Sequence, residues 1–513
     1  MGGKGYIKMN LCQHSASANI TLSDPQGNQL ATIDAKAAKD GTLGILQNPS
    51  TESGEYTLTF AGTAYLHSLS IVNLKESPYT QNGNWYIVKA GDAQSFITTL
   101  ETVNGANAAT DAPRSYIFLP NGTYDLDEAC LTTISGNNIS IIGENMDKTI
   151  IVNKPETEGI ANTGTLFNTS CNLYMQDLTL KNAYPYDAGQ TGRAICLQDK
   201  GTRTICKNVR MLSYQDTYYS NNNSGQYYFE NAEIHGIVDF ICGGGDAFFN
   251  KCNLVLEAGK AAYITAPYTN GSNYGYVFDG CKVIGTPNSS FTFGRSWNGT
   301  AKCAFLNTIL DKTAAAKIAS TRWTPACMNV IAKNLYEYNT TDEDGKVISP
   351  AENKVKFTLN TDVNEYNTIL TSAQAAEYTL DKVFTNWTPA ALASQKDPIA
   401  AKVANGKLTW TGDADMYMIE KNGEFTALTS ETSYDIDDAS AKYEVRAANE
   451  MGGFGLSEST ATGIDKVISS DDAIKTVIYS VDGMQLRHLQ KGINILVKTF
   501  ADGSKKTSKV IVR

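Results

Sequence analysis

Two aspartates, Asp216 and Asp239, occupy the same position in two consecutive sequence repeats. In both repeats, residues 207–216 and 230–239, the Asp comes eight positions after an Asn, with charged and apolar residues in matching places between them. If each repeat forms one turn of a parallel solenoid, the two carboxyl groups stack on adjacent strands, about 4.8 Å apart. Two carboxyl groups at such a short distance do not both ionise easily. We therefore expect one to stay an anion and the other to act as an acid.

The sequence around the aspartates consists of short β runs separated by turns rich in Asn and Gly. An irregular period of this kind with few helices indicates a right-handed parallel β-helix with loops of varying length, and an array of β-sandwiches is the weaker alternative. The marker residues of the repeat recur 20 to 31 residues apart, at Asp177, Asn208, Asn231, Lys251, Gly280 and Asn307.

The regions on either side of the predicted β-helix domain, residues 81–396, also have strand-like patterns. Residues 1–80 predict a β-sandwich, which is either a carbohydrate-binding module or a purely structural or truncated domain. Residues 397–462 resemble a fibronectin type III domain. Residues 463–513 resemble the C-terminal sorting domains of Bacteroidota-type secreted proteins, with an ordinary β module as the alternative. The predicted fold class is all-β, a β-helix flanked by small β-sandwich domains, with a linker over residues 387–398.

The composition excludes several classes of protein. The 513 residues carry a net charge of −10, which makes nucleic acid an unlikely partner, and no apolar run is long enough to span a bilayer. The first residues show no signal-peptide core, so we expect a trimmed or incomplete chain.

The ten Cys and four His show no metal-ligand spacing, so neither a metal nor another cofactor is expected. Cys252 and Cys281 occupy like positions of successive repeats. We predict that they are free thiols stacked inside the solenoid rather than a disulfide.

Several short blocks within residues 88–385 are similar, in order and spacing, to the pectin methylesterase family, carbohydrate esterase family 8. They are Asn-Gly-Thr-Tyr at 121–124, the apolar run at 139–151, Tyr-Gln-Asp-Thr at 214–217, Gly-Ile-Val-Asp-Phe-Ile-Cys-Gly at 236–243, Phe-Gly-Arg-Ser-Trp at 293–297 and a closing segment at 375–380. The resemblance implies a right-handed β-helix and metal-free hydrolysis of galacturonate methyl esters in pectin.

The resemblance also implies roles for single residues. Asp239 stands at the position of the nucleophile, and Arg295 would keep it ionised through a charge-assisted hydrogen bond. Asp216 would then act as general acid and afterwards as base, and the amide of Gln215 would donate to the oxyanion. Arg193 stands where the family has a Gln that is the second oxyanion donor, and its longer reach and fixed charge would change that geometry.

The expected substrate-binding residues surround these groups. Gln190 could replace the missing amide if its loop bends, and Trp297 would stack on a sugar ring. Phe240 is expected to be a substrate-binding residue because it lies in the block at 236–243. Tyr218 and Tyr219 would extend the cleft wall. Cys242 stands where the family has an aromatic residue at a sugar subsite, so an altered substrate preference is expected.

Other functions remain open at this stage. A β-helix polysaccharide lyase or glycosidase would release unsaturated or reducing sugar instead of methanol, and a non-catalytic glycan-binding protein would bind pectin without cleaving it. A thioesterase is a further hypothesis. The sequence has no Gly-x-Ser-x-Gly motif that would support a serine hydrolase. The favoured expectation is a monomeric pectinesterase that acts on methylated polygalacturonate, secreted, cell-surface or periplasmic, from a bacterium.

Overall fold

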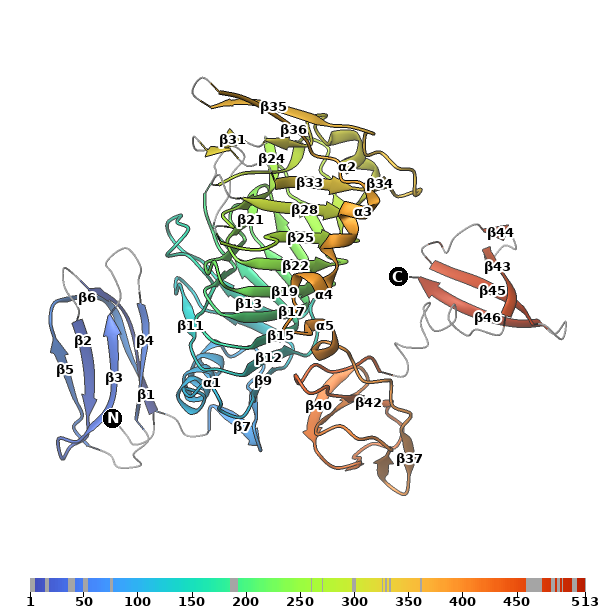
Figure 1. Ribbon diagram of the computed structural model, residues 1–513. Coiled ribbons are helices and arrows are strands. Elements are labelled where there is room, and N and C mark those ends of the chain that lie inside the picture. Colours follow the sequence, from blue (N-terminus) through green and yellow to red (C-terminus); the bar gives the residue numbers. More distant parts are fainter. Residues whose placement is uncertain are drawn as a thin grey trace. The chain divides into compact units, whose positions relative to one another are not determined.

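The computed structural model (Figure 1) describes most of the chain and divides it into two compact units, residues 1–393 and 394–513. The described residues are 5–13, 18–35, 42–48, 54–73, 77–184, 192–259, 261–269, 271–297, 301–324, 326–327, 330–331, 334–359, 362–457, 473–480, 485–486, 490, 492–500 and 505–512.

The first unit contains a parallel β-helix with three ladders of strands, which confirms the predicted fold class. The first ladder comprises β9 (Ser115–Leu119), β12 (Ile139–Gly143), the first halves of β15 (Leu173–Asn182) and β17 (Arg203–Leu212), β19 (Gln226–Glu230), β22 (Asp246–Asn250), β25 (Tyr276–Asp279), β28 (Lys302–Leu306) and β33 (Asn334–Tyr338). The second comprises β10 (Gly122–Asp125), β13 (Thr149–Asn153), the second halves of β15 and β17, β20 (Glu233–Gly236), β23 (Asn253–Leu256), β26 (Lys282–Ile284), β29 (Ile309–Leu310) and β34 (Thr341–Asp342).

The third ladder is a sheet of its own and bears the residues of greatest chemical interest. Its strands are β11 (Thr132–Ile134), β14 (Leu166–Asn168), β16 (Leu197–Asp199), β18 (Tyr218–Ser220), β21 (Val238–Gly243), β24 (Ala261–Pro267), β27 (Ser290–Arg295) and β30 (Trp323–Thr324), all paired in parallel.

The corner between the first and second ladders explains the spacing of the marker residues. Each marker has a left-handed backbone, a conformation that Gly, Asn and Asp adopt most readily. The φ angles are 56° at Asp177, 49° at Asn208, 51° at Asn231, 53° at Lys251, 62° at Gly280 and 50° at Asn307. Asn208 also donates from Nδ2 to Oδ1 of Asp177 on the coil before it, at 3.0 Å.

The interior of the β-helix is filled by like residues stacked from coil to coil. The rings of Phe229, Phe249, Phe278 and Phe305 follow one another with centroid separations of 4.6, 4.4 and 4.2 Å. Helix α1 (Ala93–Ala106) covers one end of this core with Phe96, Leu100 and Val103, and Asp92 caps it by accepting from the backbone N–H of Ser95. Cys252 and Cys281 are buried free thiols on successive coils, as predicted.

Two further β modules have antiparallel sheets. In the first unit, β4 (Thr42–Asn48), β1 (Gly5–Gln13) and β6 (Ala64–Asn73) face β3 (Gln29–Ala35), β2 (Ala18–Ser23) and β5 (Thr57–Ala61) across a shared apolar core. In the second unit, β37 (Lys402–Ala404), β38 (Lys407–Thr409) and β41 (Ser433–Asp435) share a core with β40 (Glu424–Thr429), β39 (Tyr417–Lys421) and β42 (Tyr443–Ala447).

The remaining elements are short or peripheral. They are β7 (Tyr79–Asn82), β8 (Trp85–Val88), α2 (Lys312–Lys317), β31 (Ala326–Cys327), β32 (Val330–Ile331), β35 (Lys354–Leu359), β36 (Asp362–Asn367), α3 (Ser372–Ala375), the 3-10 helix η1 (Ala376–Tyr378), α4 (Leu380–Val383), α5 (Pro389–Leu392), and the sheet of β43 (Ala473–Ser480), β44 (Gln485–Leu486), β45 (Gly492–Phe500) and β46 (Lys505–Val512). Of the helices in the described ranges, none has the length and apolar character needed to cross a membrane.

The segment expected to be a linker is structured. Helix α5 lies within it, and Trp387 is buried against Phe384 with ring centroids 5.0 Å apart. The residues that follow belong to the second unit, since Asn449 donates to the carbonyl oxygen of Ser394 at 2.9 Å and Gln395 to that of Phe454 at 3.2 Å. The chain therefore passes from one unit to the other without a long connecting loop.

Candidate active site

The two aspartates lie at matching positions of adjacent coils, as their repeat predicts. The bridge between Gln215 and Val238 and the pair Tyr218 and Ile241 both join residues 23 positions apart, which is also the separation of Asp216 and Asp239. Both aspartates have left-handed backbones, with φ of 58° and 50°.

Asp is among the residues that adopt this conformation most readily, as Asp177 does at the corner between the first and second ladders. The close turn before Asp239 depends on Gly236, because a Cβ there would lie 2.1 Å from the Cβ of Phe240.

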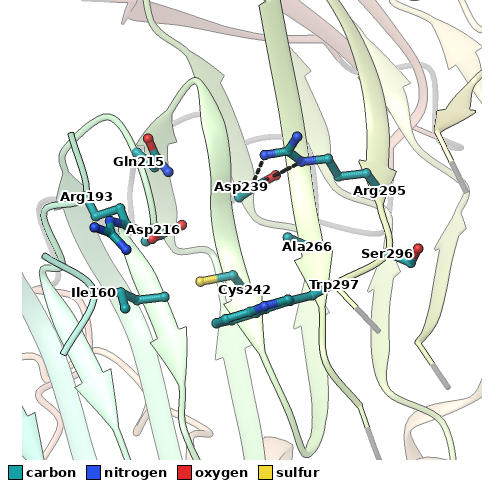
Figure 2. Close-up of a pocket in the computed structure, with 10 residues that line it drawn as sticks. All are labelled: Ile160, Arg193, Gln215, Asp216, Asp239, Cys242, Ala266, Arg295, Ser296 and Trp297. Atoms are coloured by element: carbon teal, nitrogen blue, oxygen red, sulfur yellow. Dashed lines mark hydrogen bonds and ion pairs between the residues drawn. The ribbon is translucent and has the colours of Figure 1, made fainter. Parts of the chain in front are cut away.

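The aspartates open into a cavity of about 260 Å³ on the outer side of the third ladder (Figure 2). Its lining residues are Ile160, Arg193, Gln215, Asp216, Asp239, Cys242, Ala266, Arg295, Ser296 and Trp297. The cavity therefore collects all five predicted catalytic residues and one predicted sugar-binding residue.

Asp239 is held by Arg295 through both of its carboxyl oxygens. Nε of Arg295 donates to Oδ1 at 2.9 Å and to Oδ2 at 3.2 Å, and Nη2 donates to Oδ2 at 2.6 Å (Figure 2). The guanidinium also lies over the Tyr263 ring, 4.4 Å from its centroid. A bidentate pair of this kind fixes the carboxylate in place and favours its ionised form.

Arg295 reaches Asp239 because β27 lies tightly against β24. Gly294 pairs with Thr265, and a Cβ on Gly294 would approach the Thr265 Oγ1 to 2.2 Å. The glycine in the Gly-Arg-x-Trp block is thus required by the close approach of the two strands.

The two carboxyl groups differ in their electrostatic surroundings. Burial and the neighbouring charge of Asp239 raise the pKa of Asp216 from 3.8 to about 8, although Arg193 and a hydrogen bond from the Cys242 thiol oppose the shift. Burial also raises the pKa of Asp239, but there the paired Arg295 opposes it. At neutral pH the arrangement favours a protonated Asp216 beside an ionised Asp239.

Arg193 has a partner that the sequence did not predict. Its Nε donates to Oε2 of Glu158 at 2.5 Å and its Nη2 to Oε1 at 2.6 Å, while its backbone N–H donates to Oε2 at 3.2 Å. The two side chains are 43% and 38% exposed, so the pair lies at the rim of the cavity.

Trp297 forms one wall of the cavity and belongs to an aromatic cluster. Its ring centroid is 5.9 Å from that of Tyr219 and 5.7 Å from that of Tyr268. A second hollow of about 220 Å³ adjoins this cluster and is lined by Tyr219, Ser220, Asn221, Asn222, Asn223, Gly243, Gly244, Tyr268 and Trp297. Together they offer aromatic faces and amides of the kind that bind sugar rings.

Two of the predicted substrate-binding residues lie elsewhere. Tyr218 and Phe240 are fully buried in the β-helix core, where the Tyr218 ring packs against Phe229 with centroids 4.7 Å apart. In a strand, side chains alternate between the two faces, so Tyr218 points inward while its neighbour Tyr219 is partly exposed. We correct the expectations that Tyr218 extends the cleft wall and that Phe240 binds substrate. Gln190 lies outside the described residues.

Several residues of the site were missed. Glu158 precedes its partner Arg193 by 35 positions in a loop without any repeat signal, and no sequence pattern would have revealed the pair. Tyr263 and Ala266 lie on β24 opposite Val238 and Cys242 of β21, but the register shifts between these two pairs, so a regular repeat spacing did not reveal them. Within the described ranges, no three His, Cys, Asp or Glu side chains gather in a way that could hold a metal ion.

The comparisons with known proteins agree on one family. The family described as Pectinesterase matches residues 86–386. Pectinesterase A of Dickeya dadantii (strain 3937) is 26% identical over 388 residues, covering 64% of this chain and 98% of that protein. Pectinesterase A of Emericella nidulans is 28% identical over 231 residues, covering 42% of this chain and 68% of the other.

Solved structures of similar proteins were also found. A pectin methylesterase in complex with a hexasaccharide is 25% identical, with a TM-score of 0.44, and the match covers 60% of this chain and 99% of that one. The pectin methylesterase from carrot is 19% identical, with a TM-score of 0.43, and the match covers 55% and 88% of the two chains.

Proposed function

The chain belongs to the pectinesterase family and is a carboxylic ester hydrolase, and from that premise we propose that it hydrolyses galacturonate methyl esters of pectin with Asp239 as nucleophile. The assignment of residues rests on the different surroundings of the two aspartates. Asp239 has both oxygens held by Arg295 at 2.6 to 3.2 Å. Asp216, on the adjacent coil, has a pKa raised to about 8.

In the first step, a carboxylate oxygen of Asp239 attacks the carbonyl carbon of the ester. The bond to the methoxy oxygen breaks, and Asp216 donates its proton to that oxygen, so that methanol leaves and an anhydride with Asp239 remains. In the second step, Asp216 takes a proton from the attacking water. The sugar is released as the acid, which loses its own proton to solvent, and Asp239 is a carboxylate again.

Negative charge on the carbonyl oxygen in both steps requires hydrogen-bond donors. Gln215 and Arg193 line the cavity beside the aspartates and are the donors we propose for this oxygen. Trp297 and Tyr219 are proposed to support a sugar ring next to the scissile ester. The small Cys242 side chain leaves more room there than the aromatic residue of the resembled family.

The accessory regions are proposed to serve export and attachment. The module over residues 463–513 resembles a sorting domain, and residues 1–80 and 397–462 would act as spacers or glycan-binding modules. On this basis we propose a monomeric enzyme that is secreted or held at the bacterial cell surface.

The test is methanol release from methylated pectin by the full chain and by Asp239→Asn. Asparagine keeps the shape of the side chain and cannot act as the nucleophile, so we expect kcat/KM to fall by at least about 10³-fold. Asp177→Asn is the matched control, because Asp177 is also a buried aspartate with left-handed φ, yet it does not line the cavity. It should release methanol like the wild type.

More than a few per cent of wild-type activity in Asp239→Asn would refute its role as nucleophile. Formation of unsaturated sugar in place of methanol would instead identify a lyase. Binding to pectin with neither product would identify a glycan-binding protein.

A further inference from the structure

We propose that Glu158 is a positioning residue for the hydrolytic site, which acts by holding the Arg193 guanidinium back from a direct ion pair with Asp216. The inference rests on the proposed function, since it assigns Asp216 the task of donating a proton.

Glu158 holds Arg193 at three points. Two guanidinium nitrogens of Arg193 donate to the two carboxyl oxygens of Glu158 at 2.5 and 2.6 Å, and the backbone N–H of Arg193 donates to the same carboxylate at 3.2 Å. Within the part of the chain that the structure describes, Arg193 forms its ion pair with Glu158 and none with Asp216. The guanidinium is thus oriented by a group outside the reacting pair.

Asp216 is sensitive to the position of this cation. The titratable and charged groups that act on it are Asp239, Arg193, Cys242, Arg295 and Tyr219. Arg295 is already engaged by Asp239, which leaves Arg193 as the cation whose arrangement can change the proton affinity of Asp216. An opposite charge in direct contact typically lowers the pKa of a carboxyl group by about 1 to 3.

The pair contributes little to stability, so its place at the rim of the cavity needs another reason. Both side chains are more than a third exposed, and ion pairs that solvent screens to that extent stabilise the folded state only slightly. If Arg193 were released, it could swing toward Asp216, which would then ionise and lose its ability to protonate methoxide. Glu158 prevents this, and Arg193 still lines the cavity beside Asp216.

The experiment compares the pH dependence of kcat/KM for methanol release in Glu158→Gln, Arg193→Gln and the double variant. Glu158→Gln should move the alkaline limb of the profile down by about one pH unit and lower kcat/KM about fivefold at pH 8, because the freed guanidinium favours ionised Asp216. Arg193→Gln should move that limb upward, and the double variant should match Arg193→Gln, because Glu158 acts only through Arg193. Glu158→Asp should restore most of the wild-type profile.

The matched control is Asp125→Asn, which removes a similarly exposed ion pair between Asp125 and Lys154 away from the cavity. It should leave the profile unchanged. Limbs of Glu158→Gln and Arg193→Gln that both stay in place, or both move in the same direction, would overturn the proposal. So would a Glu158→Gln chain that melts far below Asp125→Asn, because that would identify a structural role.

Failure of the proposed function would give a result that differs from failure of the Glu158 proposal. In that case the wild type would release no methanol, or Asp239→Asn would retain activity, whatever the profile of the Glu158 variants.

Discussion

Asp216 and Asp239 are the same residue type in the same backbone conformation, and their neighbours make them chemically unequal. Arg295 contacts Asp239 with two nitrogens, whereas Asp216 accepts a hydrogen bond from the Cys242 thiol and interacts with the charges of Arg193 and Arg295. A proton placed on Asp216 removes the repulsion between the carboxyl groups and keeps the ion pair of Asp239 intact. The division of roles follows from these contacts.

A protonated Asp216 makes the folded protein less stable as the pH rises. Its pKa is raised from 3.8 to about 8, so between about pH 4 and pH 8 the unfolded chain releases a proton that the folded protein retains. Each pH unit in this range costs at most about 1.4 kcal/mol. Asn does not titrate and tolerates φ of 58°, so Asp216→Asn should melt increasingly above the wild type as the pH rises from 5 to 8.

Thermal melting of both proteins at several pH values measures this difference. A gap between the two melting temperatures that is the same at every pH would contradict the raised pKa. Methanol release should be largely lost in the same variant.

Sequence patterns predicted part of the site well because its residues belong to the repeat. The register of the β-helix places Asp216, Asp239 and Gln215 on neighbouring coils, and Arg295 with Trp297 two coils further on. Tyr218 and Phe240 were misplaced, because the inward or outward direction of a side chain changes with a shift of a single residue. Glu158 could not be found, since loops outside the repeat have no fixed register.

At the scale of single elements, the chain changes direction between the first and second ladders at a corner residue with a left-handed backbone. Its marker residues were identified from spacing alone, although their shared backbone conformation was not. Asn208 combines two contributions there, a tolerated φ of 49° and a hydrogen bond to Asp177.

Substitutions at Asn208 should separate these contributions. Asn208→Ala loses both the conformational preference and the hydrogen bond, so its unfolding free energy should fall by about 2 kcal/mol. Asn208→Gly retains the left-handed preference and should lose only about 1 kcal/mol. Denaturant unfolding gives both values.

Lys251→Gly is the control at the same corner, because Lys251 has a φ of 53° and an exposed side chain. It should be neutral or slightly stabilising. Equal losses in the two Asn208 variants would show that backbone conformation contributes nothing at this corner.

At the scale of the whole molecule, the chain separates after Ala393 into two compact units. From the sequence, a domain boundary is predicted at residues 396–397 and a linker over residues 387–398, and helix α5 lies within that predicted linker. Trp387 and Phe384 are buried, and packing of such large aromatic side chains holds the adjoining backbone in the folded structure. This explains why the segment is structured and is not a linker. Such tertiary contacts are not visible in local composition.

The division predicts which truncations retain activity. A chain that ends at Ala393 should keep kcat/KM for methanol release within about twofold of the full chain, because the cavity lies wholly within the first unit. A chain that ends at Thr379 should be destabilised, since it lacks Phe384 and Trp387 and the carbonyl oxygen of Asn386 that accepts from Arg203 at 3.2 Å. Equal activity and equal melting temperatures of the two truncated chains would contradict this view.

The coil that separates Asp216 from Asp239 has only 23 residues, whereas Gln176 and Lys207, paired on earlier coils, are 31 apart. An added residue in a longer coil enlarges a loop and leaves the stacked strands where they were. Between the two aspartates, where the coil is compact, the same insertion would risk shifting one carboxyl group off its partner. Over evolutionary time, this chain can therefore gain and lose length in its longer coils, while the stretch between the two aspartates should keep a nearly fixed length.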